Sequence, residues 1–153
     1  MAKKIIIGSS AFFEGMEDFN SKDIDEMQIQ DKWLPRNRRV FNFKKNGHDI
    51  FFWSPLTKEE YIKDAFECGV RMRVGKFIVP EFAEYIGLTI DDLKRLEPIF
   101  REPTETHSYQ NIIFDSYIEN GGFFLTDEQR MKAYEEYKRE RPEKYGEQKK
   151  EEN

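Results

Sequence analysis

Residues 5–25 read I-I-I-G-S-S-A-F-F-E-G-M-E-D-F-N-S-K-D-I-D. The three isoleucines favour a short buried strand, and Gly8 ends that strand because glycine adopts backbone angles that other residues avoid. Ser9 and Ser10 are typical helix-capping residues, so we predict a short helix over 11–16. Amides at a helix start carry partial positive charge, which makes this turn a candidate site for the phosphates of a nucleotide.

Two aspartates follow the turn, Asp23 and Asp25, in a stretch whose alternation predicts a strand over 23–30. Residues two apart on a strand point to the same face, so both carboxylates are expected to project together. Mg²⁺ prefers carboxylate and phosphate oxygens, and a pair of such ions about 4 Å apart activates an attacking hydroxyl while it neutralises the leaving group. The spacing therefore indicates phosphoryl or nucleotidyl transfer.

This pattern resembles the polymerase-beta-like nucleotidyltransferase superfamily, whose signature is a strand, a Gly-Ser turn, a short helix and an Asp-x-Asp strand. The residues that match in order are Gly8, Ser9, Gly15, Asp23 and Asp25. Lys22 departs from the pattern, because serine or aspartate is common before the first aspartate. The gap between turn and aspartates is also slightly longer than in compact members. The resemblance covers roughly the first third of the chain.

The resemblance implies a particular site. A third carboxylate comes from a neighbouring antiparallel strand, and Asp49 stands at a suitable place in the chain order. Two Mg²⁺ ions would be held by Asp23, Asp25 and Asp49, with Asp49 alternatively acting as the base for the acceptor. The donor nucleoside triphosphate would be positioned by Gly8, Ser9 and Ser10. A nucleoside monophosphate would pass to an acceptor, which is an RNA, a protein or a small molecule, and pyrophosphate would leave.

A hairpin is predicted around Asn46-Gly47, with strands over 39–44 and 48–53. Asp49 shares a face with Phe51 and Trp53 on the second strand, and an acid among apolar residues needs a partner or a metal. The segment 31–53 is basic, with six lysines and arginines against two aspartates. Such a patch can receive a triphosphate or an RNA acceptor, or it can be a solvated hairpin flank.

Arg71 and Arg73 are a second candidate phosphate contact, because alternation in an extended segment places both on one side. Surface charge is the default explanation for such a pair.

The rest of the chain favours helices. Capping pairs and stop residues mark them: Thr57 with Glu60, Pro80 with Gly87, Thr89 with Asp92, residues 108–120 before Gly121, and Thr126 with Gln129. We therefore predict one α+β domain over 1–137, with a small mixed sheet of nucleotidyltransferase type in 1–56 and a helical part in 57–137. Residues 138–153 are charged and predict a disordered tail.

Composition sets further bounds. A chain of 153 residues with 38% hydrophobic content can fill one core. No apolar run reaches the length of about 20 residues that crosses a bilayer, and the N-terminus lacks a long hydrophobic signal region, so we expect a cytoplasmic protein without a membrane partner. Cys68 is the single cysteine, which excludes an internal disulfide.

Two other classes of function stay open. A catalytically silent relative of the nucleotidyltransferases, including one encoded by a virus, would serve as a binding or regulatory protein. An unrelated interaction protein would instead expose a large patch of Phe and Tyr and would not cluster Asp23, Asp25 and Asp49.

Overall fold

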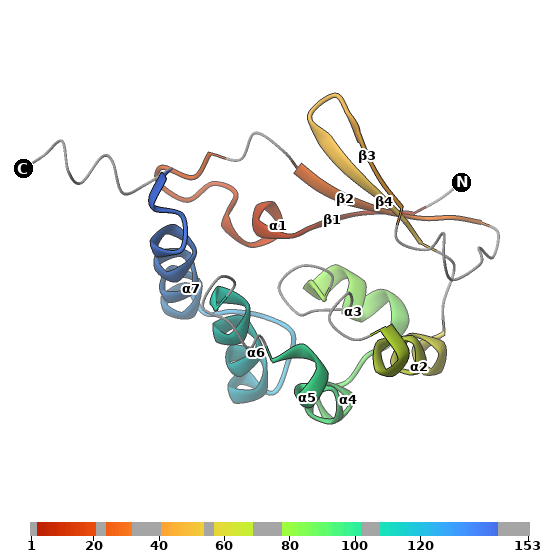
Figure 1. Cartoon of the computed structure of the whole chain (residues 1–153). Helices are drawn as coiled ribbons and strands as arrows, with labels where there is room; N and C mark the ends of the chain where they lie inside the picture. Colours follow the sequence, from red (N-terminus) through yellow and green to blue (C-terminus); the bar gives the residue numbers. More distant parts are fainter. Residues whose placement is uncertain are drawn as a thin grey trace, which may run out of the picture.

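The computed structural model of the chain describes residues 3–20, 24–31, 41–53, 57–68, 78–101 and 108–143 (Figure 1). Within these ranges the fold is α+β, with a four-stranded mixed sheet in the N-terminal part and helices that follow mostly in the C-terminal half. The predicted fold class is confirmed at this level. Helices α2 to α7 all lie to one side of the sheet in Figure 1.

The sheet consists of β1 (Lys3–Ile7), β2 (Ile24–Ile29), β3 (Phe41–Lys45) and β4 (His48–Trp53), in the spatial order β1-β2-β4-β3. β1 runs antiparallel to β2, and β3 runs antiparallel to β4. β2 and β4 are parallel to each other. The β3–β4 hairpin turns at Asn46 and Gly47 as predicted, and both residues have positive φ, at 53° and 79°.

The helices are α1 (Ser9–Phe13), α2 (Lys58–Cys68), α3 (Pro80–Ile86), α4 (Ile90–Arg95), α5 (Glu97–Phe100), α6 (Tyr109–Asn120) and α7 (Asp127–Arg139). The prediction of a helix over 11–16 capped by serine was wrong. α1 begins at Ser9, and Gly8 is its N-cap, without a side-chain cap. Because Gly8 turns the chain directly after β1, both serines fall inside the helix.

Three predicted capping boxes are confirmed. Glu60 N donates to Thr57 Oγ1 at 3.1 Å, and Thr57 N donates back to Glu60 Oε1 at 3.1 Å. The same reciprocal pairs begin α4 at Thr89 with Asp92, and α7 at Thr126 with Gln129. These caps satisfy amides that have no partner within the helix, which is why local sequence is sufficient to place the helix starts.

The core lies between the helices and one face of the sheet. Strand register puts Ile5 and Met27, and likewise Met27 and Phe51, side by side on that face. These residues belong to one buried cluster that also contains residues of α1, α2, α3, α4, α6 and α7. The sheet and the helical half of the described chain therefore share a core.

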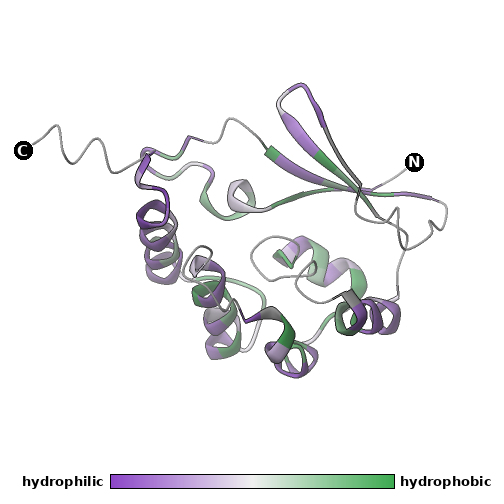
Figure 2. Cartoon of the chain, in the orientation of Figure 1, coloured by the Kyte–Doolittle hydropathy of each residue, from purple (hydrophilic) through white to green (hydrophobic). Residues whose placement is uncertain are grey.

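α7 packs by means of tyrosines. Most of its ribbon is hydrophilic in Figure 2, and its buried residues are Ala133, Tyr134 and Tyr137. The rings of Tyr134 and Tyr137 lie with their centroids 5.2 and 5.0 Å from that of Phe13 in α1. α7 continues to Arg139, two residues past the predicted domain boundary at 137.

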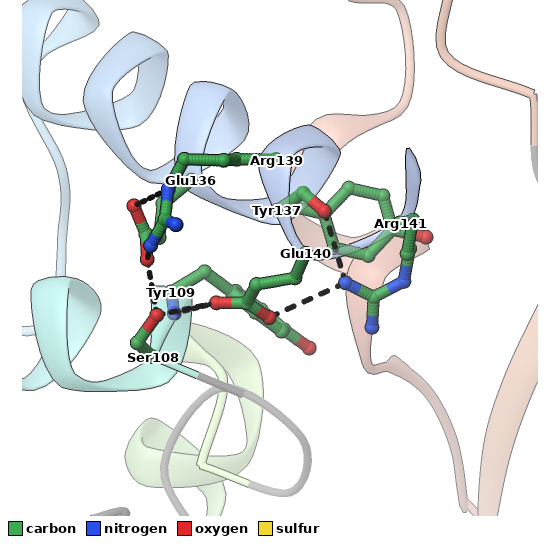
Figure 3. A network of polar contacts seen from close by, with 7 residues as sticks. All are labelled: Ser108, Tyr109, Glu136, Tyr137, Arg139, Glu140 and Arg141. Carbon is green, nitrogen blue, oxygen red and sulfur yellow. Dashed lines mark hydrogen bonds and ion pairs between the residues drawn. The ribbon is translucent and has the colours of Figure 1, made fainter. Parts of the chain in front are cut away.

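A polar network fastens the end of α7 to the start of α6 (Figure 3). α6 has no side-chain cap of its own. The carboxylate of Glu140 supplies the missing acceptor, because it accepts from Tyr109 N at 2.9 Å and from Ser108 Oγ at 2.6 Å. Its side chain is only 2% exposed. The carboxylate of Glu136, which is held by Arg139, also lies within hydrogen-bond distance of Ser108 Oγ, so the two carboxylates share the single hydroxyl proton.

No helix in the described ranges is long and apolar enough to span a membrane.

Candidate functional site

Four residues form a row across the sheet, one from each strand. Ile7 pairs with Asp25, Asp25 pairs with Asp49, and Asp49 pairs with Lys44. Register partners lie on the same face, and neighbouring strands are about 4.8 Å apart. Asp25 and Asp49 therefore stand side by side, although 24 positions separate them in the sequence.

The turn at Gly8 lies directly against this pair. Gly8 follows Ile7 at the end of β1 and has φ 72° and ψ −157°. A Cβ added at Gly8 would lie 2.6 Å from Asp25 Oδ2 and 3.4 Å from Asp25 Cβ. The structure thus brings together three of the predicted site residues, Gly8, Asp25 and Asp49, at one end of the sheet.

Asp49 does lie on a strand next to Asp25, but the expected antiparallel arrangement was wrong. β4 is parallel to β2, because the chain places β3 at the sheet edge and returns through the hairpin so that β4 occupies the inner position. Ile24 N donates to Gly47 O at 3.0 Å, which joins the hairpin turn to the start of β2. Both aspartates consequently occupy the second position of their strands, at the same end of the sheet.

Both carboxylates lie where the apolar layer ends. Asp25 and Asp49 share the sheet face of Met27 and Phe51, which are core residues. Asp25 is half-buried, and the side chain of Asp49 is 22% exposed. Two acids at the rim of a core, with limited access to water, are suited to sharing a divalent cation.

Lys44 contacts Asp49, one member of this pair. Its Nζ lies 3.7 Å from Asp49 Oδ1, on the side away from Asp25. The ammonium partly neutralises Asp49 and leaves less negative charge for a metal ion. Lys44 is one of the six basic residues of the predicted patch in segment 31–53, but its contact with Asp49 was not predicted, because that contact depends on the hairpin register rather than on a motif.

The structure shows less about the remaining predicted site residues. Asp23, Arg71 and Arg73 lie outside the described residues. Ser9 is half-buried, and Ser10 is 6% exposed. Among the described residues, no group of three His, Cys, Asp or Glu side chains is placed to hold a metal ion. In the described part, the proposed metal site therefore consists of Asp25 and Asp49.

The loop after α1 is held by two side chains of α7 that the sequence reasoning missed. Arg130 donates to the carbonyls of Phe12 and Glu14, and Tyr134 donates to the carbonyl of Glu17. The only sequence signal is spacing, since residues four apart share a face of a helix. That spacing does not name the partner.

The opposite face of the sheet carries a second polar group. Glu26 is 5% exposed and accepts from Gln28 Nε2 at 2.6 Å. Its other oxygen lies 3.0 Å from His48 Nδ1. Burial raises the pKa of Glu26, but the hydrogen bonds to Gln28 and His48 and the charge of Lys4 outweigh it, so the pKa lies below its ordinary value of 4.5.

We expect Glu26→Gln to make the free energy of unfolding less dependent on pH in the acidic range. A carboxyl whose pKa is lowered by folding contributes stability above its unfolded value, and this contribution is lost as the pH falls through the folded pKa. The wild type should exceed the variant by about 1 kcal/mol in free energy of unfolding at pH 6, and the difference should shrink below pH 4.5. Urea unfolding from pH 6 to pH 3 measures it.

Glu84→Gln on the exposed side of α3 is the matched control. It removes a carboxylate that is solvated, so its difference from the wild type should stay near zero at every pH. A Glu26→Gln difference that does not change with pH would contradict the hydrogen-bonded, ionised Glu26.

A cavity of about 360 Å³ lies elsewhere, between the α3–α4 link and the α6–α7 turn. Its lining consists of Leu88, Thr89, Ile90, Asp91, Gly121, Gly122 and Phe123. None of the predicted site residues lines it. One exposed carboxylate and two glycines provide few converging polar groups, so this cavity is a weaker candidate than the aspartate pair.

Comparison with known proteins adds no relative: no family model, no curated protein and no solved structure matches the chain. The functional argument therefore depends on the geometry of the site.

Proposed function

We propose that the protein is a metal-dependent nucleotidyltransferase, with a sheet of the nucleotidyltransferase type. The observation that carries this proposal is the meeting of Gly8, Asp25 and Asp49 at one end of the sheet. Two adjacent carboxylates suit the metal ions of a bound triphosphate, and a glycine turn beside them lets the backbone come close. The same meeting speaks against the unrelated interaction protein, for which no clustering of these aspartates was expected.

Asp25 and Asp49 would hold Mg²⁺, together with the predicted third ligand Asp23. When bound, the metal supplies charge neutralisation at the phosphates and at the leaving pyrophosphate. The acceptor oxygen would form a bond to the α-phosphorus as the bond from that phosphorus to the β-phosphate oxygen breaks. Asp49 either completes the metal site or takes the acceptor's proton. Gly8 lets the backbone approach Asp25, and the chain contributes chiefly positioning and electrostatics.

Calorimetric titration tests the proposal. The probes are the α,β-methylene analogues of ATP and GTP, which cannot transfer a nucleotide, each with and without Mg²⁺. We expect Mg²⁺-dependent binding to the wild type and a loss of at least about 100-fold in the Asp25→Asn, Asp49→Asn double variant, because both metal-ligating charges are removed.

Asp91→Asn is the control, because Asp91 is an exposed carboxylate that lines the separate cavity. It should bind the analogues like the wild type. Equal binding by the double variant, or no binding by the wild type, would contradict the proposal that these aspartates hold the metal ion.

A catalytically silent nucleotidyltransferase relative is the second candidate, and Lys44 is the observation that favours it. Its ammonium, 3.7 Å from Asp49 Oδ1, already supplies positive charge at the pair. A protein of this kind would bind the analogues equally well with and without Mg²⁺. The same titration therefore separates the two functions.

A further inference from the structure

α1 is too short to hold its own position. It has five residues, and its last carbonyls have no partner within the helix. Helices of this length are not stable by themselves in water, so contacts from elsewhere must fix them. At the start of α1 the chain is tied to β1 through Gly8. At its C-terminal end, α1 is held by a side chain of α7.

This side chain is Arg130, whose guanidinium group makes two hydrogen bonds to the backbone there. Its Nε donates to Phe12 O at 2.6 Å, and its Nη2 donates to Glu14 O at 2.9 Å. These two carbonyls lie on either side of the last residue of α1. The guanidinium therefore satisfies the open end of the helix and fixes its direction.

Tyr134 holds the next turn of the loop. Its hydroxyl donates to Glu17 O at 2.7 Å, and the residue is 1% exposed. Two residues of this loop have positive φ, Gly15 at 88° and Asp18 at 65°. Glycine adopts positive φ freely, whereas Asp18 keeps this conformation only where its surroundings enforce it. Three carbonyls between Phe12 and Glu17 are thus held by one face of α7.

We propose that Arg130 is a positioning residue for the site, acting through α1 on the Gly8 turn. This inference rests on the proposed function. At one end of α1, Gly8 lies so close to Asp25 that an added Cβ would be 2.6 Å from its Oδ2, and Arg130 holds the other end. A tilt of so short a helix changes the place of the turn relative to Asp25. The guanidinium donates to backbone carbonyls at the end of α1 and just after it, so it acts on the ligand only through the backbone.

The geometry requires arginine rather than a positive charge alone. A guanidinium offers several N–H groups in a fixed plane, whereas an ammonium is a compact point charge that does not reproduce the fork. Arg130→Lys keeps the positive charge and most of the side-chain length, but it cannot make both hydrogen bonds in the same geometry. Arg139→Lys is the matched control, because Arg139 also lies on α7 and donates to Glu136 of its own helix.

The experiment measures two quantities in the wild type, Arg130→Lys and Arg139→Lys, at a temperature where urea unfolding shows all three to be folded. The first is hydrogen exchange of the amides of residues 10–20. The second is calorimetric affinity for α,β-methylene ATP with Mg²⁺. In Arg130→Lys we expect faster exchange in that segment and affinity lower by about tenfold, because small misplacements at a site have large effects. Arg139→Lys should match the wild type in both.

The outcomes that overturn the inference are distinct. Faster exchange with unchanged affinity would show that Arg130 is structural only. Unchanged exchange would show that Arg130 does not hold the loop. A wild type that binds no triphosphate removes the proposed function and the positioning role together, and exchange in Arg130→Lys still decides whether Arg130 holds the loop.

Discussion

Phe13→Ala is expected to lower the free energy of unfolding by about 3–5 kcal/mol, which is the usual effect of removing a buried phenylalanine ring. Phe13 is 0% exposed and lies at the centre of the aromatic cluster between α1, α6 and α7. Its ring centroid is 5.0 Å from that of Tyr137 and 5.7 Å from that of Tyr109. An alanine leaves a cavity that large neighbouring rings cannot collapse to fill. Urea denaturation measures the change.

Phe124→Ala is the control for this prediction. Phe124 is 53% exposed, so the same substitution should change the free energy of unfolding by less than about 0.5 kcal/mol. Because small domains are stable by only about 5–15 kcal/mol, the loss at Phe13 is a large share of the total. Equal effects of the two substitutions would contradict the packing of α1 on α7.

Local features of the fold were predictable from sequence, because their causes lie within a few residues. The capping boxes at Thr57, Thr89 and Thr126 each depend on a side chain three positions away. The hairpin turn has a local cause as well, since Asn46 and Gly47 both adopt positive φ. The order of the strands was not predictable in this way, since the parallel pairing of β2 with β4 depends on how the chain crosses between them.

The candidate site likewise combines residues that were predictable from sequence with contacts that were not. Gly8, Asp25 and Asp49 were selected by residue type and chain order, and the structure brings them together. The contacts of Lys44 and Arg130 were not predicted, because local sequence does not encode them. Lys44 reaches Asp49 only through the hairpin register. Arg130 reaches the carbonyl of Phe12 across a separation of 118 residues.

Gly8→Ala is expected to damage both stability and binding. Gly8 has φ 72° and ψ −157°, a region that is essentially restricted to glycine, so alanine strains the backbone by about 1–3 kcal/mol. The new Cβ would also lie 2.6 Å from Asp25 Oδ2, which forces the carboxylate to move. We expect Mg²⁺-dependent binding of α,β-methylene ATP to fall by at least about tenfold. Calorimetry and urea denaturation measure the two effects.

Gly87→Ala separates the two causes. Gly87 at the end of α3 also has positive φ, at 74°, but a Cβ there would meet nothing within 4 Å. It should therefore show backbone strain without the loss of binding. Asp25→Ala provides the second comparison, because it removes the carboxylate oxygen that the new methyl group would meet. If the contact at 2.6 Å is the cause, Gly8→Ala should cost less stability in the Asp25→Ala background than in the wild type. If the two substitutions are purely additive, the whole loss of stability in Gly8→Ala comes from backbone strain. Gly8 would then matter for folding rather than for the position of Asp25.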